Sequence, residues 1–95
     1  MSASLWYAIA TVDVLNGYGI DTEGLRKSLT GEITTEEVEG EVVTHDSHKA
    51  LIHMQQLTDE QFMAMRFDTD VQMLSYAATQ ELLATAEWAS LENET

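Results

Sequence analysis

The sequence contains no cysteine and no proline among its 95 residues. Without cysteine, a disulfide framework and a cysteine-based metal or redox site are both excluded. Without proline, no position breaks a helix from within. The chain also lacks an apolar run of the about 18 residues that a membrane span needs, and its first residues lack the basic region of a signal peptide. We therefore expect a cytoplasmic protein that does not enter a membrane.

Basic side chains are also scarce, with four Lys and Arg against 17 Asp and Glu and a formal net charge of -13. Nucleic acids and anionic membranes need a basic footprint, so neither is expected to bind directly. A basic protein surface is the partner that this charge favours. Hydrophobic residues still make up 44% of the chain, too many for a disordered acidic tail. We expect one domain, residues 1–95.

Three segments share a pattern that is typical of a helix start. An apolar residue precedes a capping residue and acidic or polar residues, and a second apolar residue follows five positions after the first. The apolar pairs are Ile20–Leu25, Ile33–Val38 and Leu57–Phe62, with Asp21, Thr34 and Thr58 as the N-caps. The pattern predicts helices over about 22–30, 35–44 and 59–67.

Two further helices are expected, a short one over 46–56 and the longest over about 70–91. In the longer segment Val71, Leu74, Ala78 and Leu82 recur at spacings of three and four, which is helical periodicity. The predicted fold is therefore all-α, a compact single domain of five or six helices. Its long C-terminal helix should pack against the shorter ones.

Residues 5–15 fit either a helix or a strand, because their apolar residues follow both periodicities. Asn16-Gly17 can end a helix or form a hairpin turn. We favour the helix because most of the chain favours helix. The alternative is an α+β fold with a short N-terminal hairpin, or with a short strand near 39–43 that pairs with the N-terminal segment.

Acidic side chains are concentrated in two groups. The first places five glutamates within ten residues with no base among them: Glu32, Glu36, Glu37, Glu39 and Glu41. The second comprises Asp59, Glu60, Asp68 and Asp70. Like charges four residues apart destabilise a helix, so the first group is unfavourable unless it has a use. One interpretation is a solvated helix face. The other is a partner-binding surface in which carboxylates stand in for phosphates, and we assign all nine residues to it.

Residues 35–40 resemble the inhibitory helix motif (S/T)-x-x-x-E-(G/N) of antitoxins and self-inhibited proteins of the Fic adenylyltransferase family. The resemblance implies a helix on which Glu39 obstructs an enzyme's nucleotide site. It covers six residues of a degenerate pattern, and we do not assign the chain to that family on it.

No pattern for nucleophilic catalysis, phosphate binding or dinucleotide binding occurs in the chain. His45, His48 and His53 lie within nine residues, but their spacing is not that of a zinc-binding helix. We interpret them as surface or cap histidines. The sequence thus predicts a protein that is not an enzyme, with no catalytic residue, metal or cofactor.

The leading hypothesis is an acidic binding protein that engages a basic surface of a protein partner, such as a nucleic-acid-binding protein or nuclease. Its strongest form is an inhibitor that mimics nucleic-acid charge, of the kind that phages and mobile elements direct against host nucleases, restriction or CRISPR systems. Its location would then be the cytoplasm of the host cell. The alternative is a homodimer or antitoxin-like adaptor with an apolar interface formed by Trp88, Met63 or Phe67, whose acidity serves solubility only.

Overall fold

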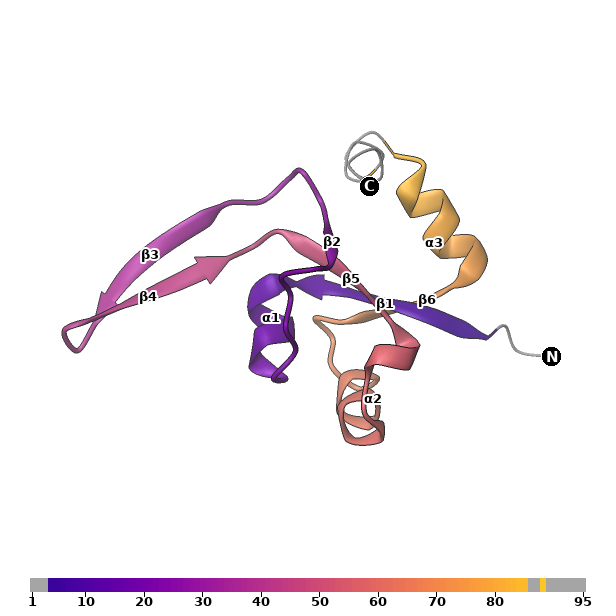
Figure 1. Cartoon of the computed structure of the whole chain (residues 1–95), viewed down its shortest axis with the longest axis horizontal. Helices are drawn as coiled ribbons and strands as arrows, with labels where there is room; N and C mark the ends of the chain where they lie inside the picture. Colours follow the sequence, from indigo (N-terminus) through magenta and orange to yellow (C-terminus); the bar gives the residue numbers. More distant parts are fainter. Residues whose placement is uncertain (1–3, 86–87, 89–95) are drawn as a thin grey trace.

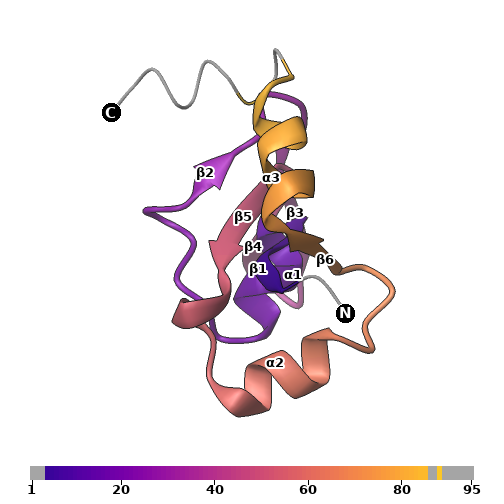
Figure 2. The ribbon, with the colours of Figure 1, turned by 90° about the vertical axis from the view of Figure 1, so that its right-hand side faces the viewer.

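The computed structural model describes residues 4–85 and 88, and in them the chain is a mixed α/β protein (Figures 1 and 2). Six strands and three short α-helices are present there, so the all-α prediction is wrong. The elements are β1 (Leu5–Thr11), α1 (Val12–Gly17), β2 (Arg26–Lys27), β3 (Ile33–Val38), β4 (Glu41–Asp46), β5 (Lys49–His53), the 3-10 helix η1 (Met54–Gln56), α2 (Asp59–Met65), β6 (Gln72–Ser75) and α3 (Tyr76–Leu83).

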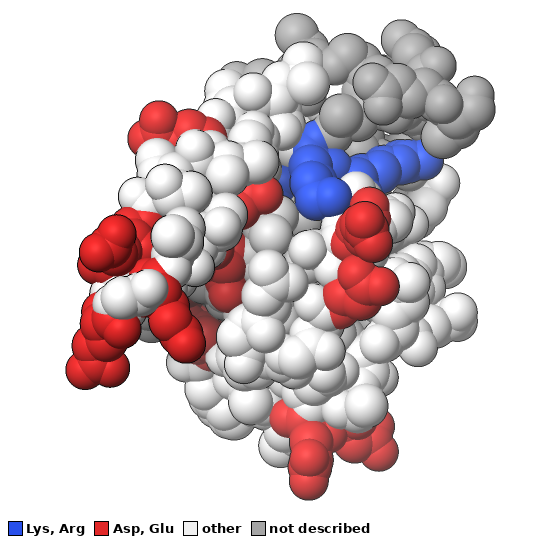
Figure 3. All heavy atoms as spheres, turned by 60° about the vertical axis from the view of Figure 1, so that its left-hand side comes forward, with Lys and Arg blue, Asp and Glu red and all other residues white. Residues whose placement is uncertain are grey.

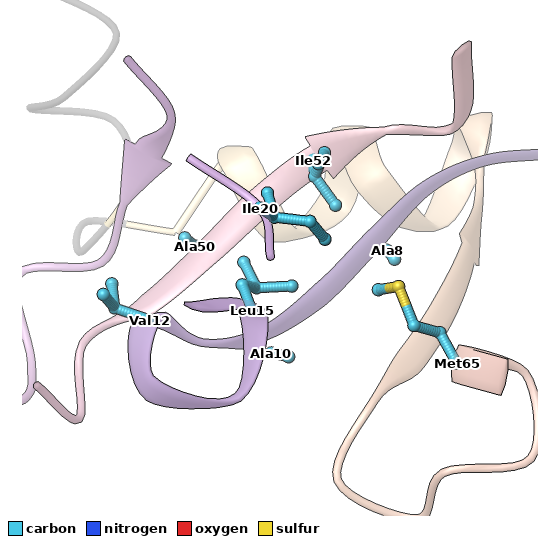
Figure 4. Packing of buried hydrophobic residues seen from close by; sticks show 8 residues of the cluster. All are labelled: Ala8, Ala10, Val12, Leu15, Ile20, Ala50, Ile52 and Met65. Carbon is cyan, nitrogen blue, oxygen red and sulfur yellow. The ribbon is translucent and has the colours of Figure 1, made fainter. Parts of the chain in front are cut away.

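Four strands form an antiparallel sheet in the order β2-β5-β1-β6, with β5 and β1 at its centre. Helices cover both faces. On one face the side chains of β1 and β5 pack against α1 and α2, as Figure 4 shows for Ala8, Ala10, Val12, Leu15, Ile20, Ala50, Ile52 and Met65. On the other face α3 covers a second cluster, formed by Ile9, Leu51, Leu74, Leu83 and Trp88. The sheet is therefore the middle layer of three.

The central position of β1 explains why its sequence was ambiguous. Ala8, Ile9 and Ala10 are all buried although they point alternately to opposite faces, so the strand lacks the alternation of a half-buried strand. The helix predicted over 5–15 is therefore wrong for Leu5–Thr11, which form the strand β1. From there the chain does turn helical, because the Thr11 hydroxyl caps α1 by accepting the N–H of Val14.

The α+β alternative comes closer, but it paired the wrong strands. The segment near 39–43 contributes to a strand, yet β1 pairs with β5 and β6, while among the described residues β3 and β4 pair only with each other. The two sheets are thus separate.

Of the three predicted helix starts, only the one at Thr58 is confirmed. Thr58 and Gln61 form a reciprocal capping box at the start of α2. Asp21 instead accepts the N–H of Glu23 in a local turn, and Thr34 lies within β3. The helices predicted over 22–30 and 35–44 are therefore absent. Residues 35–40 form no helix, which removes the structural basis of the Fic motif resemblance.

The remaining two helix predictions are also corrected. Residues 46–56 contain β5, whose Ala50, Leu51 and Ile52 are buried in the sheet centre, followed by η1. The helix predicted from about residue 70 begins only at Tyr76, because β6 first pairs with the free edge of β1. The far part of that prediction, residues 86–87 and 89–91, lies outside the described residues.

The β3–β4 hairpin projects from the sheet as an arm (Figure 1). Its projection makes the Cα radius of gyration 14.2 Å, above the about 12 Å expected for a compact domain of this length. We call residues 32–46 the acidic arm. In the described part of the chain, no helix is long and apolar enough to cross a membrane.

Candidate functional site: the acidic arm

The acidic arm carries all five glutamates of the first predicted group, and each of them is exposed. Every residue of β3 and β4 except Asp46 is exposed. Six residues per strand give an arm of about 20 Å, at about 3.4 Å per residue. The sequence analysis expected these glutamates on a helix. In the structure they lie on a two-stranded β-ribbon.

The arm ends in a two-residue turn formed by Glu39 and Gly40. Their φ angles are 51° and 83°, both positive, as in the type I′ turn that suits the twist of a hairpin. Asn-Gly is the favoured pair for this turn. A glutamate in the left-handed region is strained by about 1–2 kcal/mol. The Glu39 carboxylate at the tip is therefore accompanied by backbone strain that lowers local stability.

The strand register divides the arm into two faces, because residues that pair across an antiparallel ladder share a face. Glu37 pairs with Val42, and Glu36 pairs with Val43. The β-branched face contains Ile33, Thr35, Glu37, Val42, Thr44 and Asp46. The acidic face contains Thr34, Glu36, Val38, Glu41, Val43 and His45.

The two faces differ in their exposed chemistry. On the β-branched face Ile33 and Val42 are 63% and 70% exposed, and Glu37 is the carboxylate that has no hydrogen bond or ion pair within the described residues. On the acidic face Glu36 and Glu41 lie among Val38 and Val43, which are less exposed. Both faces of the arm thus carry apolar side chains and carboxylates, with the most exposed apolar residues on the face that holds Glu37.

The carboxylates of the arm have no basic neighbour across the ladder. Glu36, Glu37 and Glu41 each pair with a valine, and the arm contains no Lys or Arg. Within the described residues, Glu36 contacts the ring of His45, while Glu37, Glu39 and Glu41 enter no ion pair. Their charge is therefore not neutralised by an ion pair within the described residues.

At the root of the arm, side chains and backbone tie it to the body. Asp13 of α1 accepts the N–H of Asp46 at 2.9 Å, and its second oxygen lies 3.5 Å from Nδ1 of His45. Ser47 donates its N–H to the carbonyl of Glu32, and its hydroxyl accepts the Glu32 N–H, both at 3.0 Å. These contacts fix where the arm leaves the sheet.

Close backbone packing also occurs at Gly31, just before the arm. Its φ is 132°, and a Cβ there would lie 2.7 Å from both the backbone N and the Cα of His48. Only glycine fits such a contact in this conformation.

Asp46 holds the return strand at the root. Its carboxylate accepts the backbone N–H of His48 at 2.9 Å and contacts Nδ1 of the His48 ring at 2.7 Å. Burial raises the pKa of Asp46, but these bonds and the charges of His48 and Lys27 together hold that pKa below its ordinary value. Asp46 is therefore an internal anchor of the arm and is not available to a partner.

The second predicted acidic group is not brought to the arm. Asp59 and Glu60 are exposed in the first turn of α2, where they complement the helix dipole. Figure 1 shows α2 away from the arm, and in Figure 3 the carboxylates form separate groups rather than one continuous surface. The nine predicted residues thus do not make one site.

Asp68 within that group has an internal role. It accepts the hydroxyl of Tyr18 at 2.5 Å and the N–H of Asp70 at 2.8 Å. The Tyr18 bond, followed by the Asp70 N–H, lowers the pKa of Asp68 against an opposing effect of burial. The same bond raises the pKa of Tyr18.

The apolar residues of the alternative hypothesis are divided by their exposure. Trp88 is 2% exposed and belongs to the core, so it cannot anchor a partner. Met63 and Phe67 are exposed, Phe67 at 75%, and the guanidinium of Arg66 lies 5.2 Å from the Phe67 ring centroid. Two exposed apolar side chains, both in contact with Arg66, therefore lie at the end of α2.

Sequence reasoning missed an exposed aromatic cluster at the start of β1. The Trp6 ring lies 5.4 Å from that of Tyr76 and 5.9 Å from that of His53. Because these residues are far apart in the sequence, no local pattern could have brought them together.

No side-chain arrangement in the described residues suggests metal chemistry. No group of three or more His, Asp and Glu side chains there could hold a metal ion. His53 caps η1 by accepting the N–H of Gln55, while His45 and His48 contact the carboxylates described above.

Comparison of the chain with protein-family models, with curated proteins and with solved structures finds no match.

Proposed function

We propose that this chain is a non-enzymatic binding protein whose acidic arm engages a basic surface of a protein partner. The observation that carries the proposal is the arm itself. Four glutamates lie on a protruding ribbon and a fifth at its root, with no Lys or Arg among them. A protruding element can enter a partner surface that the body of the domain cannot reach.

The local energetics support a use for these carboxylates. Glutamate is depleted in strands, and Glu39 occupies a turn position where asparagine is more favourable. If charge served solubility alone, it could sit on the body of the domain without these local costs. A basic partner would offset the repulsion among the carboxylates and would be drawn to them over a range set by salt.

We infer that the partner is a nucleic-acid-binding protein or nuclease, because such proteins carry the basic surfaces that an acidic ribbon can occupy. The protein would then act as an inhibitor that mimics nucleic-acid charge, in the cytoplasm of the cell that holds the partner. Inhibitors encoded by phages and mobile elements against restriction, CRISPR and other host nucleases are often small and acidic. That comparison is an analogy of composition.

The experiment compares two variants of equal net charge. Glu36, Glu37, Glu39 and Glu41 are changed to Gln in the arm variant, and Asp21→Asn, Glu23→Gln, Asp59→Asn and Glu60→Gln are combined in the control. Each carries -9 in place of -13, since four charges are removed. Both serve as bait in affinity capture from lysate, with identification by mass spectrometry.

We expect basic nucleic-acid-binding proteins to be retained by the wild type and the control at low salt and lost from the arm variant. If both variants retain the same proteins as the wild type, the arm is not the binding element. If both lose them equally, only net charge matters and the proposal is wrong.

The second candidate function is an apolar homodimer or adaptor, which the exposed Met63 and Phe67 favour. It predicts association that does not weaken with salt. Sedimentation equilibrium at low and high salt, with Phe67→Ser as the test variant, separates it from the first proposal.

A further inference from the structure

We infer that a cleft between α3 and the sheet binds a small organic anion, which places its charged end beside Lys49 and its apolar body inside the cleft. The cleft is open to the surface and has a volume of about 520 Å³, which lies within the roughly 300–1,000 Å³ of small-molecule sites. None of its described lining residues belongs to the acidic arm, so this site does not depend on the proposed function.

The interior of the cleft is apolar. Ile9 of β1 and Leu74 of β6 line it from the sheet and are almost fully buried, whereas Ala78 and Leu82 line it from α3 and are partly exposed. All four belong to the second core cluster or pack against it, on the face of the sheet that α3 covers. A concave apolar wall with a few polar groups around it is the usual form of a site for a small ligand. An aliphatic or aromatic body would therefore be buried there.

Two basic side chains lie on the same face of the sheet as the cleft. Arg26 pairs with Leu51 across the β2–β5 ladder, and Lys49 precedes Leu51 by two residues on β5, so the three side chains share that face. Lys49 lines the cleft, and Arg26 lines a smaller hollow that Leu51 and Leu83 also line. Diagonal neighbours of this kind lie about 7–8 Å apart, within reach of long side chains. Both bases can therefore contact one anionic group at the mouth of the cleft.

The grouping of these bases is unusual for so acidic a chain. With Lys27 on β2, Arg26 and Lys49 make up three of the four Lys and Arg residues, and the basic side chains seen in Figure 3 form one group. The chain contains 17 Asp and Glu, yet in the part that the structure describes no Lys or Arg enters an ion pair. Bases that lie together without acids repel each other. A bound anion removes this repulsion and accepts charge-assisted hydrogen bonds from them.

Glu81 decides which kind of anion fits. It lines the cleft from α3, and it forms no ion pair with Lys49 within the described residues. A bare inorganic ion would be repelled by this carboxylate and would leave the apolar interior empty. An organic anion can place its apolar body between the two charged residues and donate an N–H or O–H to Glu81, which accepts hydrogen bonds. The ligand class is therefore an amphipathic organic anion with a hydrogen-bond donor.

The test uses two fluorescent probes that share the anilinonaphthalene rings and the N–H group. The first, 8-anilinonaphthalene-1-sulfonate, is anionic, and the second, N-phenyl-1-naphthylamine, lacks the sulfonate and is neutral. Each is titrated into the full-length protein at about 150 mM salt, where charges more than about 8 Å apart are largely screened. We expect one sulfonate probe to bind per chain, at least about tenfold more tightly than the neutral probe.

Lys49→Gln should weaken binding of the sulfonate probe at least about fivefold and leave the neutral probe unchanged, because one charge-assisted hydrogen bond is lost. Arg66→Gln is the matched control. It removes the same charge from the end of α2, outside the described lining of the cleft, and should bind both probes as the wild type does. Ala78→Leu fills the cleft and should abolish binding of both probes. Circular dichroism and melting establish that each variant is folded.

Equal affinity for the two probes would overturn the inference, as would equal effects of Lys49→Gln and Arg66→Gln or unchanged binding by Ala78→Leu. If Ala78→Leu does not fold, the comparison of Lys49→Gln with Arg66→Gln still decides. The variant with Gln at 36, 37, 39 and 41 should bind both probes as the wild type does. Probe binding therefore reports on the cleft and affinity capture reports on the arm, so either proposal can fail without the other.

Discussion

His45 on β4 lies 3.5 Å from Asp13 on α1, and this pair links the acidic arm to the body of the protein. The other ring nitrogen of His45 lies 3.3 Å from Glu36 on the arm itself. A neutral imidazole has one N–H, so only the imidazolium can donate to both carboxylates. The pair is one of several contacts between the arm and the body, and it places one side chain between two acids.

Replacing His45 by Gln should loosen the arm without unfolding the protein. Both contacts are partly exposed, so their loss should cost at most about 1 kcal/mol. Amide hydrogen exchange in β3 and β4 should therefore speed up measurably, by up to about fivefold, with melting of the body unchanged. Glu37→Gln on the opposite face is the control. Unchanged exchange in His45→Gln would show that the link does not hold the arm.

Replacing Gly31 by Ala should destabilise the root of the arm. The new methyl group would lie 2.7 Å from the backbone of His48 at a φ of 132°, so both sterics and backbone conformation oppose it. We expect a loss of about 2 kcal/mol or more in the free energy of unfolding, or loss of protection confined to residues 31–48. Gly24→Ala is the matched control, because a Cβ there meets nothing within 4 Å. Equal stability of the two variants would contradict this packing.

Acid should destabilise the protein through Asp46 and Asp68, whose pKa values are lowered in the fold. In the unfolded chain an aspartate has a pKa of about 3.9. In the fold the pKa lies lower. The stabilisation is therefore complete above the pKa of the unfolded chain and is lost as the pH falls from there through the pKa of the folded protein. Melting temperatures should therefore fall between pH 5 and pH 3.

Asp68→Asn should melt below the wild type at pH 7 and lose less stability between pH 5 and pH 3. The control is Asp70→Asn, since the Asp70 backbone N–H and not its side chain contacts Asp68. If the two variants have identical pH profiles, the Tyr18–Asp68 bond does not contribute in this way.

Replacing Glu39 by Asn should separate arm stability from binding. Asn is favoured where φ is positive, so amide exchange in the hairpin should slow, by a factor that corresponds to about 1 kcal/mol. Affinity for the partner should nevertheless fall, because the tip carboxylate is removed. If the Glu39→Asn variant binds more tightly than the wild type, the tip carboxylate does not contribute to affinity, and the conformation of the turn does.

How far the sequence predicts the fold is seen in the three helix starts. Thr58 is followed by Asp59-Glu60-Gln61 and then by Phe, Met and Ala, with no β-branched residue or glycine before the helix ends. Thr34 is followed instead by Thr35 and Val38 and then by Gly40, Val42 and Val43, which favour strands and a turn. The capping pattern was correct only where the following residues also favoured helix.

Other errors came from tertiary context. β1 and β5 are buried on both faces, so their apolar runs carried no strand periodicity. β6 forms because the edge of β1 is available to residues 72–75, which no local pattern reveals. The candidate site could be proposed from charge, since an excess of carboxylates without bases is visible in the sequence itself. Its two faces were not found, because they depend on strand register.

The salt dependence of the purified complex tests the central claim most directly. The dissociation constants of the wild type, the variant with Gln at 36, 37, 39 and 41, and the equal-charge control are measured between 50 and 500 mM salt. The account predicts a steep loss of affinity with salt for the wild type and the control and a clearly shallower slope for the arm variant. Equal slopes for the arm variant and the control, or binding by the wild type that does not change with salt, would contradict it.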